Sequence, residues 1–131
     1  MDSKEVIIDT NFFMVPFQFN VDIIDELEKK LPSYKLIAPS FVIDELYGLK
    51  HNSKGKTRLN AGMALKLAKC SPIEIKDISL LENETVDDAL IRISDVLATN
   101  DIELKKRAKE KGISIVYLRQ KKYISIDGKV L

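Results

Sequence analysis

Short apolar runs alternate along this chain with segments whose apolar residues recur at helical spacing, and this alternation limits the fold more than any other feature. Each expected strand is a brief run of mostly apolar residues, and the strands lie at 5–9, 35–39, 73–78, 96–99 and 113–118. The expected helices lie between them, at 22–31, 40–50, 57–70, 85–94 and 102–111. Strands that are apolar on both sides are typical of a parallel sheet covered by helices on both faces. The chain is therefore expected to form an α/β three-layer sandwich with a central parallel sheet.

The length of 131 residues suits one domain, which we take as residues 1–131. A terminal hairpin is expected at about 122–131, because Asp127 and Gly128 form a turn signal between alternating apolar residues. The single cysteine, Cys70, excludes an internal disulfide and is expected to be a small core residue. No stretch approaches the roughly 18 apolar residues of a membrane span, and the chain does not begin with a secretion signal. We therefore expect a cytoplasmic protein with no membrane partner.

Acidic residues stand where two of the expected strands end. Asp9 closes the run IIDTN, and Asp101 closes the run VLATND. Ligands of parallel α/β sheets bind outside the carboxyl ends of the strands, so these two side chains are expected to lie close together. Either aspartate alone could serve only as a helix cap or a turn residue.

Two further pairs of acids lie on expected helices. In the helix of 40–50, Glu45 lies at the border of the buried face, because successive side chains turn by about 100°. Asp44 points in nearly the opposite direction and is expected to be solvated. In the next acidic pair, Asp87 and Asp88 both lie off the apolar face, and periodicity does not decide between them.

Several carboxylates at one sheet edge repel one another, and a divalent cation removes this repulsion. Carboxylate oxygens are the ligands that Mg²⁺ and Mn²⁺ prefer, whereas one His and one Cys are too few for a site of softer ligands. Such an ion lowers the pKa of a bound water and neutralises charge that develops on a phosphodiester. A site with one or two of these ions is therefore expected.

Positive charge is concentrated in two stretches, although the formal net charge is only +1. Residues 46–73 contain no acid, and 104–122 contain eight Lys or Arg against one acid. Basic stretches beside an acidic edge suit a polyanion whose backbone is held while one phosphodiester meets the metal. A solvated basic surface is the alternative interpretation. The residues expected to contact RNA are Lys50, Lys54, Lys56, Arg58, Lys105 and Arg119.

The ordered set IIDTN, PSFVIDEL, DDALI and ATND, followed by a basic helix and GISIVYL, resembles the PIN domain over essentially the whole chain. The resemblance is closest to stand-alone PIN nucleases related to those that process small-subunit ribosomal RNA. PIN proteins are α/β nucleases that cut single-stranded RNA with Mg²⁺ or Mn²⁺ held by a cluster of acids. The resemblance therefore implies an endoribonuclease whose partner is single-stranded RNA, with a ribosomal RNA precursor as the expected substrate.

The same resemblance assigns roles to individual residues. The family's catalytic and metal-binding acids match Asp9, Glu45, Asp88 and Asp101. Its auxiliary polar residues match Asn11, Asp87, Thr99 and Asn100. The short distance between DDALI and ATND departs from the family pattern and bears on the assignment of Asp88.

Other functions stay open at this point. A VapC-type toxin ribonuclease would share the site and the chemistry, and a neighbouring antitoxin gene would favour it. A non-catalytic RNA-binding PIN scaffold belongs to another class, and the presence of all four acids argues against it. A phosphotransfer enzyme of the haloacid dehalogenase type would need an aspartate where Asn11 stands. Dimers are common in the PIN family, so a homodimer is a further expectation.

Overall fold

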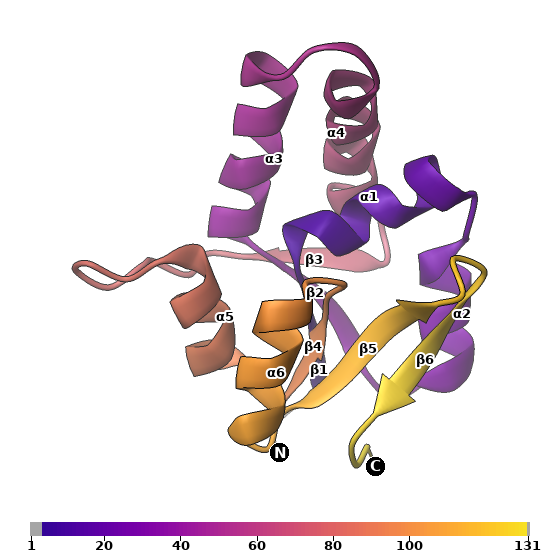
Figure 1. Cartoon of the computed structure of the whole chain (residues 1–131), viewed down its shortest axis with the longest axis vertical. Helices are drawn as coiled ribbons and strands as arrows, with labels where there is room; N and C mark the ends of the chain where they lie inside the picture. Colours follow the sequence, from indigo (N-terminus) through magenta and orange to yellow (C-terminus); the bar gives the residue numbers. More distant parts are fainter. Residues whose placement is uncertain (1–3, 131) are drawn as a thin grey trace.

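A computed structural model of the protein describes residues 4–130. Its strands are β1 (Glu5–Ile8), β2 (Lys35–Pro39), β3 (Ile73–Lys76), β4 (Val96–Ala98), β5 (Ser114–Arg119) and β6 (Tyr123–Asp127). Its helices are α1 (Thr10–Phe19), α2 (Ile23–Lys30), α3 (Ser40–Asn52), α4 (Gly55–Ala68), α5 (Val86–Ile93) and α6 (Ile102–Glu110). Figure 1 shows how these elements are arranged around one sheet.

The six strands form a single sheet in the order β3-β2-β1-β4-β5-β6. Strands β1 to β5 pair in parallel, and β6 runs antiparallel to β5 at one edge. The chain moves outward from β1 to β3 and then returns to β4 on the other side of β1. Because crossovers between parallel strands are right-handed, this order places α1–α4 and α5–α6 on opposite faces. The expected three-layer α/β architecture is confirmed.

The central strands are buried on both faces, as their apolar residues predicted. Val6, Ile7 and Ile8 of β1 are at most 2% exposed, and so is Leu97 of β4. Residues Ile8 and Ala98 are partners at the ends of β1 and β4. These two carboxyl ends lie where the strand order reverses, which is where α/β sheets place their ligands.

Helix α1 had no counterpart among the expected helices. Phe12, Phe13 and Val15 are fully buried, so the segment lacks the polar face that reveals an amphipathic helix. Pro16 also lies inside the helix, where proline is ordinarily disfavoured. Helix α1 continues directly from β1 and is capped at its start by Asp9.

Helices α3 and α4 are antiparallel neighbours that stand above the carboxyl edge of the sheet (Figure 1). The turn between them is short, since α3 ends at Asn52 and α4 begins at Gly55. A Cβ atom added at Gly62 of α4 would meet the Lys50 side chain of α3 at 3.9 Å. The stem of Lys50 therefore covers α4, and the two helices project as one unit.

The end of the chain differs from the expected hairpin at 122–131. The hairpin is formed by β5 and β6, and its turn lies at Gln120 and Lys121, which both have positive φ. Gly128 instead follows the last strand with φ +118°, and a Cβ atom there would lie 2.7 Å from Ser114 Oγ. The pair Asp127-Gly128 was wrongly interpreted as a hairpin turn, because glycine here permits close backbone packing.

Cys70 is exposed, so the expectation of a core position is wrong. The buried residues of α4 end at Ala68, and Cys70 lies beyond them in the turn that leads to β3. Within residues 4–130, no helix combines the length and apolar character that crossing a membrane requires.

Candidate active site at the carboxyl edge of the sheet

Acidic side chains from four chain segments line one pocket of about 200 Å³ at the carboxyl edge. The junctions that follow β1 and β4 contribute Asp9 and Asp101, α3 contributes Glu45, and α5 contributes Asp87. The other lining residues are Thr10, Asn11, Met14 and Leu49. The expectation that strand-end acids and helical acids meet at this edge is confirmed.

Asp9 is the most constrained of these acids. Its side chain is held at both oxygens, because Oδ1 accepts a hydrogen bond from Thr10 N at 2.7 Å and Oδ2 accepts one from Thr99 Oγ1 at 2.7 Å. Burial raises the pKa of Asp9 to about 6, against the effect of these two hydrogen bonds. The negative charges of Glu45 and Asp87 raise the pKa further. The raised pKa of Asp9 therefore reflects, in part, the close approach of the other carboxylates.

Glu45 reaches the pocket from α3 and is held by a neighbour on α1. The Thr10 hydroxyl donates a short hydrogen bond to Glu45 Oε1. Asp44 and Glu45 are both exposed on α3, but only Glu45 lines the pocket. The helical geometry that separated Glu45 from Asp44 is confirmed by their positions.

Asp101 caps α6 and also faces the pocket. Its Oδ1 accepts a hydrogen bond from Leu104 N at 3.0 Å, which is the usual role of an N-cap residue. Its backbone N–H donates to Thr99 Oγ1 at 3.1 Å. Capping and pocket lining are thus compatible in this residue.

The two adjacent acids of α5 lie differently with respect to the pocket, and Asp88, which the resemblance assigned to the site, lies outside its lining. Asp88 accepts a hydrogen bond from Thr85 N and forms an ion pair with Arg107 Nη2 at 2.7 Å. Its position as the third residue of α5 completes a capping box with Thr85, and Asp88 is not among the residues that line the pocket. Asp87 lines the pocket instead. Burial and the charge of Asp101 raise the pKa of Asp87, and Arg107 opposes them.

The auxiliary asparagines brace the backbone around the site. Asn11 Oδ1 accepts a hydrogen bond from Asn100 N at 3.1 Å, which ties α1 to the segment after β4. Asn100 Oδ1 accepts one from Leu118 N at 2.7 Å, which ties the same segment to β5. Thr99 is fully buried between Asp9 and Asp101. These contacts hold the strand ends in register.

None of the residues expected to contact RNA is among the residues that line the pocket. Lys54, Lys56 and Arg58 are exposed where α3 turns into α4. Lys105 Nζ lies 4.3 Å from the centre of the Tyr117 ring. Lys50, on α3, is half-buried, and Arg119, at the end of β5, is exposed.

Arg107 was missed among the basic residues of α6, although its charge reaches Asp87. It lies between the buried residues Leu104 and Ala108, at the border of the buried face. That border position is the sequence signal by which Glu45 was selected, and it would also have selected Arg107.

The donor set fits a hard divalent cation. Of the residues that the structure describes, those lining the pocket include four carboxylates, one hydroxyl and one amide, and no lysine or arginine. Over the same residues, no three acidic, histidine or cysteine side chains already stand in a ligating arrangement. Mg²⁺ typically takes one or two carboxylates directly and keeps several waters. Asp9, Glu45, Asp87 and Asp101 could therefore hold such an ion with water completing its shell.

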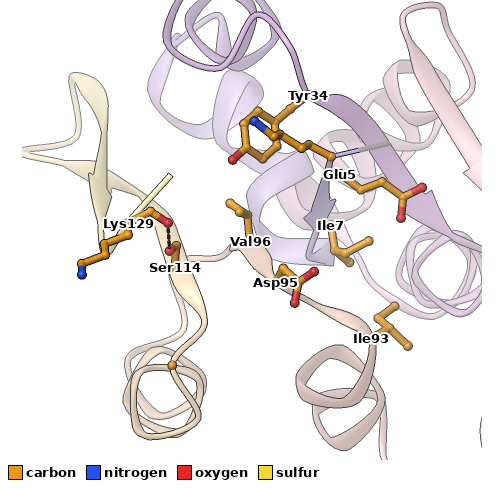
Figure 2. Close-up of a pocket in the computed structure, with 10 residues that line it drawn as sticks. Glu5, Ile7, Tyr34, Ile93, Asp95, Val96, Ser114 and Lys129 are labelled. Carbon is orange, nitrogen blue, oxygen red and sulfur yellow. Dashed lines mark hydrogen bonds between the residues drawn. The ribbon is translucent and has the colours of Figure 1, made fainter. Parts of the chain in front are cut away.

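A larger cavity of about 390 Å³ lies at the opposite, amino edge of the sheet (Figure 2). Both charge signs line it, since the lining residues include Lys4 and Lys129 as well as Glu5 and Asp95. Glu5 forms an ion pair with Lys76 at 3.0 Å. Size alone therefore does not identify the site, because the larger cavity lacks the concentration of like charge seen at the carboxyl edge.

The fold and the site define a class of α/β domain in which acids from neighbouring strand ends and from helices line one oxygen-rich pocket. Residues 6–121 match the family described as PIN like domain. The chain therefore belongs to the PIN domain family, and the resemblance inferred from the ordered motifs is confirmed.

Relatives of known sequence or structure extend over nearly the whole chain. Ribonuclease VapC9 of Archaeoglobus fulgidus is 32% identical over 126 residues, which cover 92% of this chain and 87% of that protein. Ribonuclease VapC4 of Methanocaldococcus jannaschii is 29% identical over 136 residues, which cover 96% and 98%. The PIN domain endonuclease Utp24 aligns with a TM-score of 0.77 and 26% identity, covering 98% of this chain and 94% of that one. A domain of a functionally unknown protein from M. jannaschii, with 19% identity and a TM-score of 0.62, shares the fold.

Proposed function

We propose that this protein is an endoribonuclease that hydrolyses phosphodiester bonds of single-stranded RNA with Mg²⁺ or Mn²⁺ as its cofactor. One observation carries this proposal: four carboxylates from separate chain segments line a pocket to which, within the described chain, no lysine or arginine contributes. Two relatives are named ribonucleases, and the similar Utp24 domain is named an endonuclease, which supports the same activity.

In this proposal the metal-holding acids are Asp9, Glu45, Asp87 and Asp101. A bound divalent ion supplies charge neutralisation at the scissile phosphate and lowers the pKa of a water molecule. Thr10 orients the Glu45 carboxylate, and Thr99 orients that of Asp9. At neutral pH Asp9 is mostly ionised, because its pKa of about 6 lies below 7.

Asp88 leaves the proposed catalytic set because its two oxygens are engaged by Thr85 and Arg107. The exposed basic residues at the tip of α3 and α4 would hold RNA at a distance from the acids. These residues are Lys54, Lys56 and Arg58. Long-range attraction of this kind acts on the RNA backbone and does not read its sequence.

Processing of a ribosomal RNA precursor is the role that we assign first, because ATND, the basic helix after it and GISIVYL resemble stand-alone PIN nucleases related to those of ribosomal RNA processing. A VapC-type toxin is the second candidate, and the 32% identity to Ribonuclease VapC9 favours it. Mapping of new RNA ends in cells that make the active protein or its Asp9→Asn variant separates the two. Ends confined to ribosomal RNA precursors support processing, whereas ends in other RNA support the toxin.

Cleavage of an unstructured RNA oligonucleotide tests the activity itself. We expect Mn²⁺-dependent cleavage by the wild-type protein and a loss of at least about 100-fold in Asp9→Asn, as is usual when a group that holds the catalytic charge is removed. Asp44→Asn is the matched control, because Asp44 is an exposed acid beside Glu45. RNA binding without any metal-dependent cleavage would favour the non-catalytic scaffold.

A further inference from the structure

An exposed ion pair joins α5 to α6 beside the acidic pocket. Arg107 Nη2 donates to Asp88 Oδ1 at 2.7 Å, and both side chains keep more than two fifths of their surface exposed. The preceding residue, Asp87, lines the pocket. The pair therefore fixes a guanidinium at the rim of a cluster of carboxylates.

Helix stability does not require this pair. The start of α5 is already stabilised by the capping box, in which Thr85 Oγ1 accepts from Asp88 N at 3.1 Å and Asp88 Oδ2 accepts from Thr85 N at 3.3 Å. Exposed ion pairs generally contribute little to the free energy of unfolding. The more informative feature is the location of the guanidinium.

Two other basic side chains of α6 make contacts away from the pocket. Lys105 lies over the ring of Tyr117, and Lys109 pairs with Asp127 at 2.8 Å near the end of β6. Arg107 alone among these three pairs with a residue next to a pocket acid, since its partner Asp88 directly follows Asp87. Its charge therefore lies near the acids that we propose to hold the metal.

We infer that Arg107 binds a backbone phosphate of the RNA next to the one at the acidic pocket, and that Asp88 holds Arg107 in position for this contact. This inference rests on the proposed nuclease function. A guanidinium has five N–H donors, and Asp88 takes one of them, so the planar group can still bind a phosphate through two others. Arg107 is thus a substrate-binding residue, and Asp88 is a positioning residue.

The position of Arg107 has a consequence for how RNA approaches the site. A phosphodiester chain would be repelled by four carboxylates before any metal contact forms. A fixed cation at the rim compensates part of that repulsion and aligns the chain across the pocket. Because the contact is with phosphate, it is expected to act on all sequences alike.

Binding of a fluorescein-labelled single-stranded RNA to the full chain tests this inference, with Asp9→Asn present throughout to prevent cleavage. We expect Arg107→Gln to weaken binding about tenfold and to reduce the slope of log K against log salt by about 0.7, the value for one phosphate contact on a single strand. Arg107→Lys should retain part of the affinity, because charge remains while the two-point contact is lost. Lys29→Gln, which breaks an exposed ion pair on α2, should change neither quantity.

The Asp88→Asn variant distinguishes RNA binding by Arg107 from a purely structural role of the pair between Arg107 and Asp88. Asp88→Asn should leave the salt slope unchanged and weaken binding less than Arg107→Gln does, because Arg107 remains present but is less well held. Equal losses in both variants with an unchanged slope would overturn the inference and leave Arg107 as a strut between α5 and α6. Normal binding by Arg107→Gln would also overturn it. Failure of the Asp9→Asn protein itself to bind RNA would count against the proposed nuclease function as well.

Discussion

Thr99 donates a hydrogen bond from Oγ1 to Asp9 Oδ2 at 2.7 Å across 90 positions of sequence. The same oxygen accepts from the backbone N–H of Asp101 at 3.1 Å. One buried hydroxyl thus connects the acids that follow β1 and β4. A hydroxyl is suited to this position because it donates and accepts at once.

Replacement of this hydroxyl should disturb Asp9 more than its surroundings. Thr99→Val keeps the shape but removes a bond that lowers the pKa of Asp9, so that pKa should rise above about 6. We expect a loss of roughly 1–3 kcal/mol in the free energy of unfolding, since the Asp101 N–H also loses its partner. Chemical denaturation and the pH dependence of metal-dependent cleavage measure the two effects. Thr99→Ser keeps the hydroxyl, so its stability and its pH dependence of cleavage should match those of the wild type. A Thr99→Val variant that matches the wild type in both quantities would contradict the role of the Thr99 hydroxyl.

The raised pKa of Asp9 predicts how the metal-free protein responds to pH. The folded state binds the proton more tightly than the unfolded state, whose pKa is 3.8, so this contribution is fully present below about pH 4. It is lost as pH rises through about 6, and its full size is about 3 kcal/mol. In EDTA, Asp9→Asn should therefore gain stability relative to the wild type between pH 4 and pH 7.

Manganese should reverse this difference at pH 7.5, where it stabilises the wild-type protein and has little effect on Asp9→Asn. Denaturation curves with EDTA and with Mn²⁺ at matched pH give the comparison. A constant difference between the two proteins from pH 4 to pH 7 would show that Asp9 does not titrate in this range.

The adjacent acids of α5 should respond differently to the same substitution. Asp87→Asn removes a pocket carboxylate, so we expect cleavage to fall by about 100-fold or more. Asp88→Asn disturbs only the cap and the pair with Arg107, so cleavage should fall by less than about tenfold. Single-turnover cleavage rates with Mn²⁺ decide the order. The reverse order would restore Asp88 to the site and remove Asp87 from it.

Much of this architecture follows from sequence because it depends on local patterns. The buried strands, the helices from α2 to α6 and the meeting of strand-end acids follow from apolar spacing and from the geometry of parallel sheets. Glu45 was distinguishable from Asp44 because the two residues occupy different angles around one helix. These signals lie within a single element.

The features that sequence did not predict depend on distant partners. Asp87 and Asp88 both lie off the apolar face of α5, and the deciding contact comes from Arg107 on another helix. Helix α1 is apolar around much of its circumference, so it has no period to detect. The hairpin turn lies at Gln120 and Lys121, residues without the usual preference for positive φ.

Two glycines provide a matched test of backbone packing. Gly128→Ala places a Cβ atom 2.9 Å from Ser114 Cα at a φ of +118°, so we expect a loss of roughly 2 kcal/mol or more in the free energy of unfolding. Gly48→Ala in α3 meets nothing closer than 4.0 Å and should stabilise the protein by about 0.5–1 kcal/mol. Thermal denaturation of both variants measures the contrast. Equal stability of the two would refute the packing role of Gly128.

The acids of the pocket come from positions spread between Asp9 and Asp101. During translation, the first of them leaves the ribosome long before the last, and β4 must insert beside β1 before Asp101 can approach Asp9. Under the proposed function, a partly synthesised chain lacks the assembled site and is not expected to cleave RNA. Cleavage is therefore expected to begin only after β4 has joined the sheet beside β1.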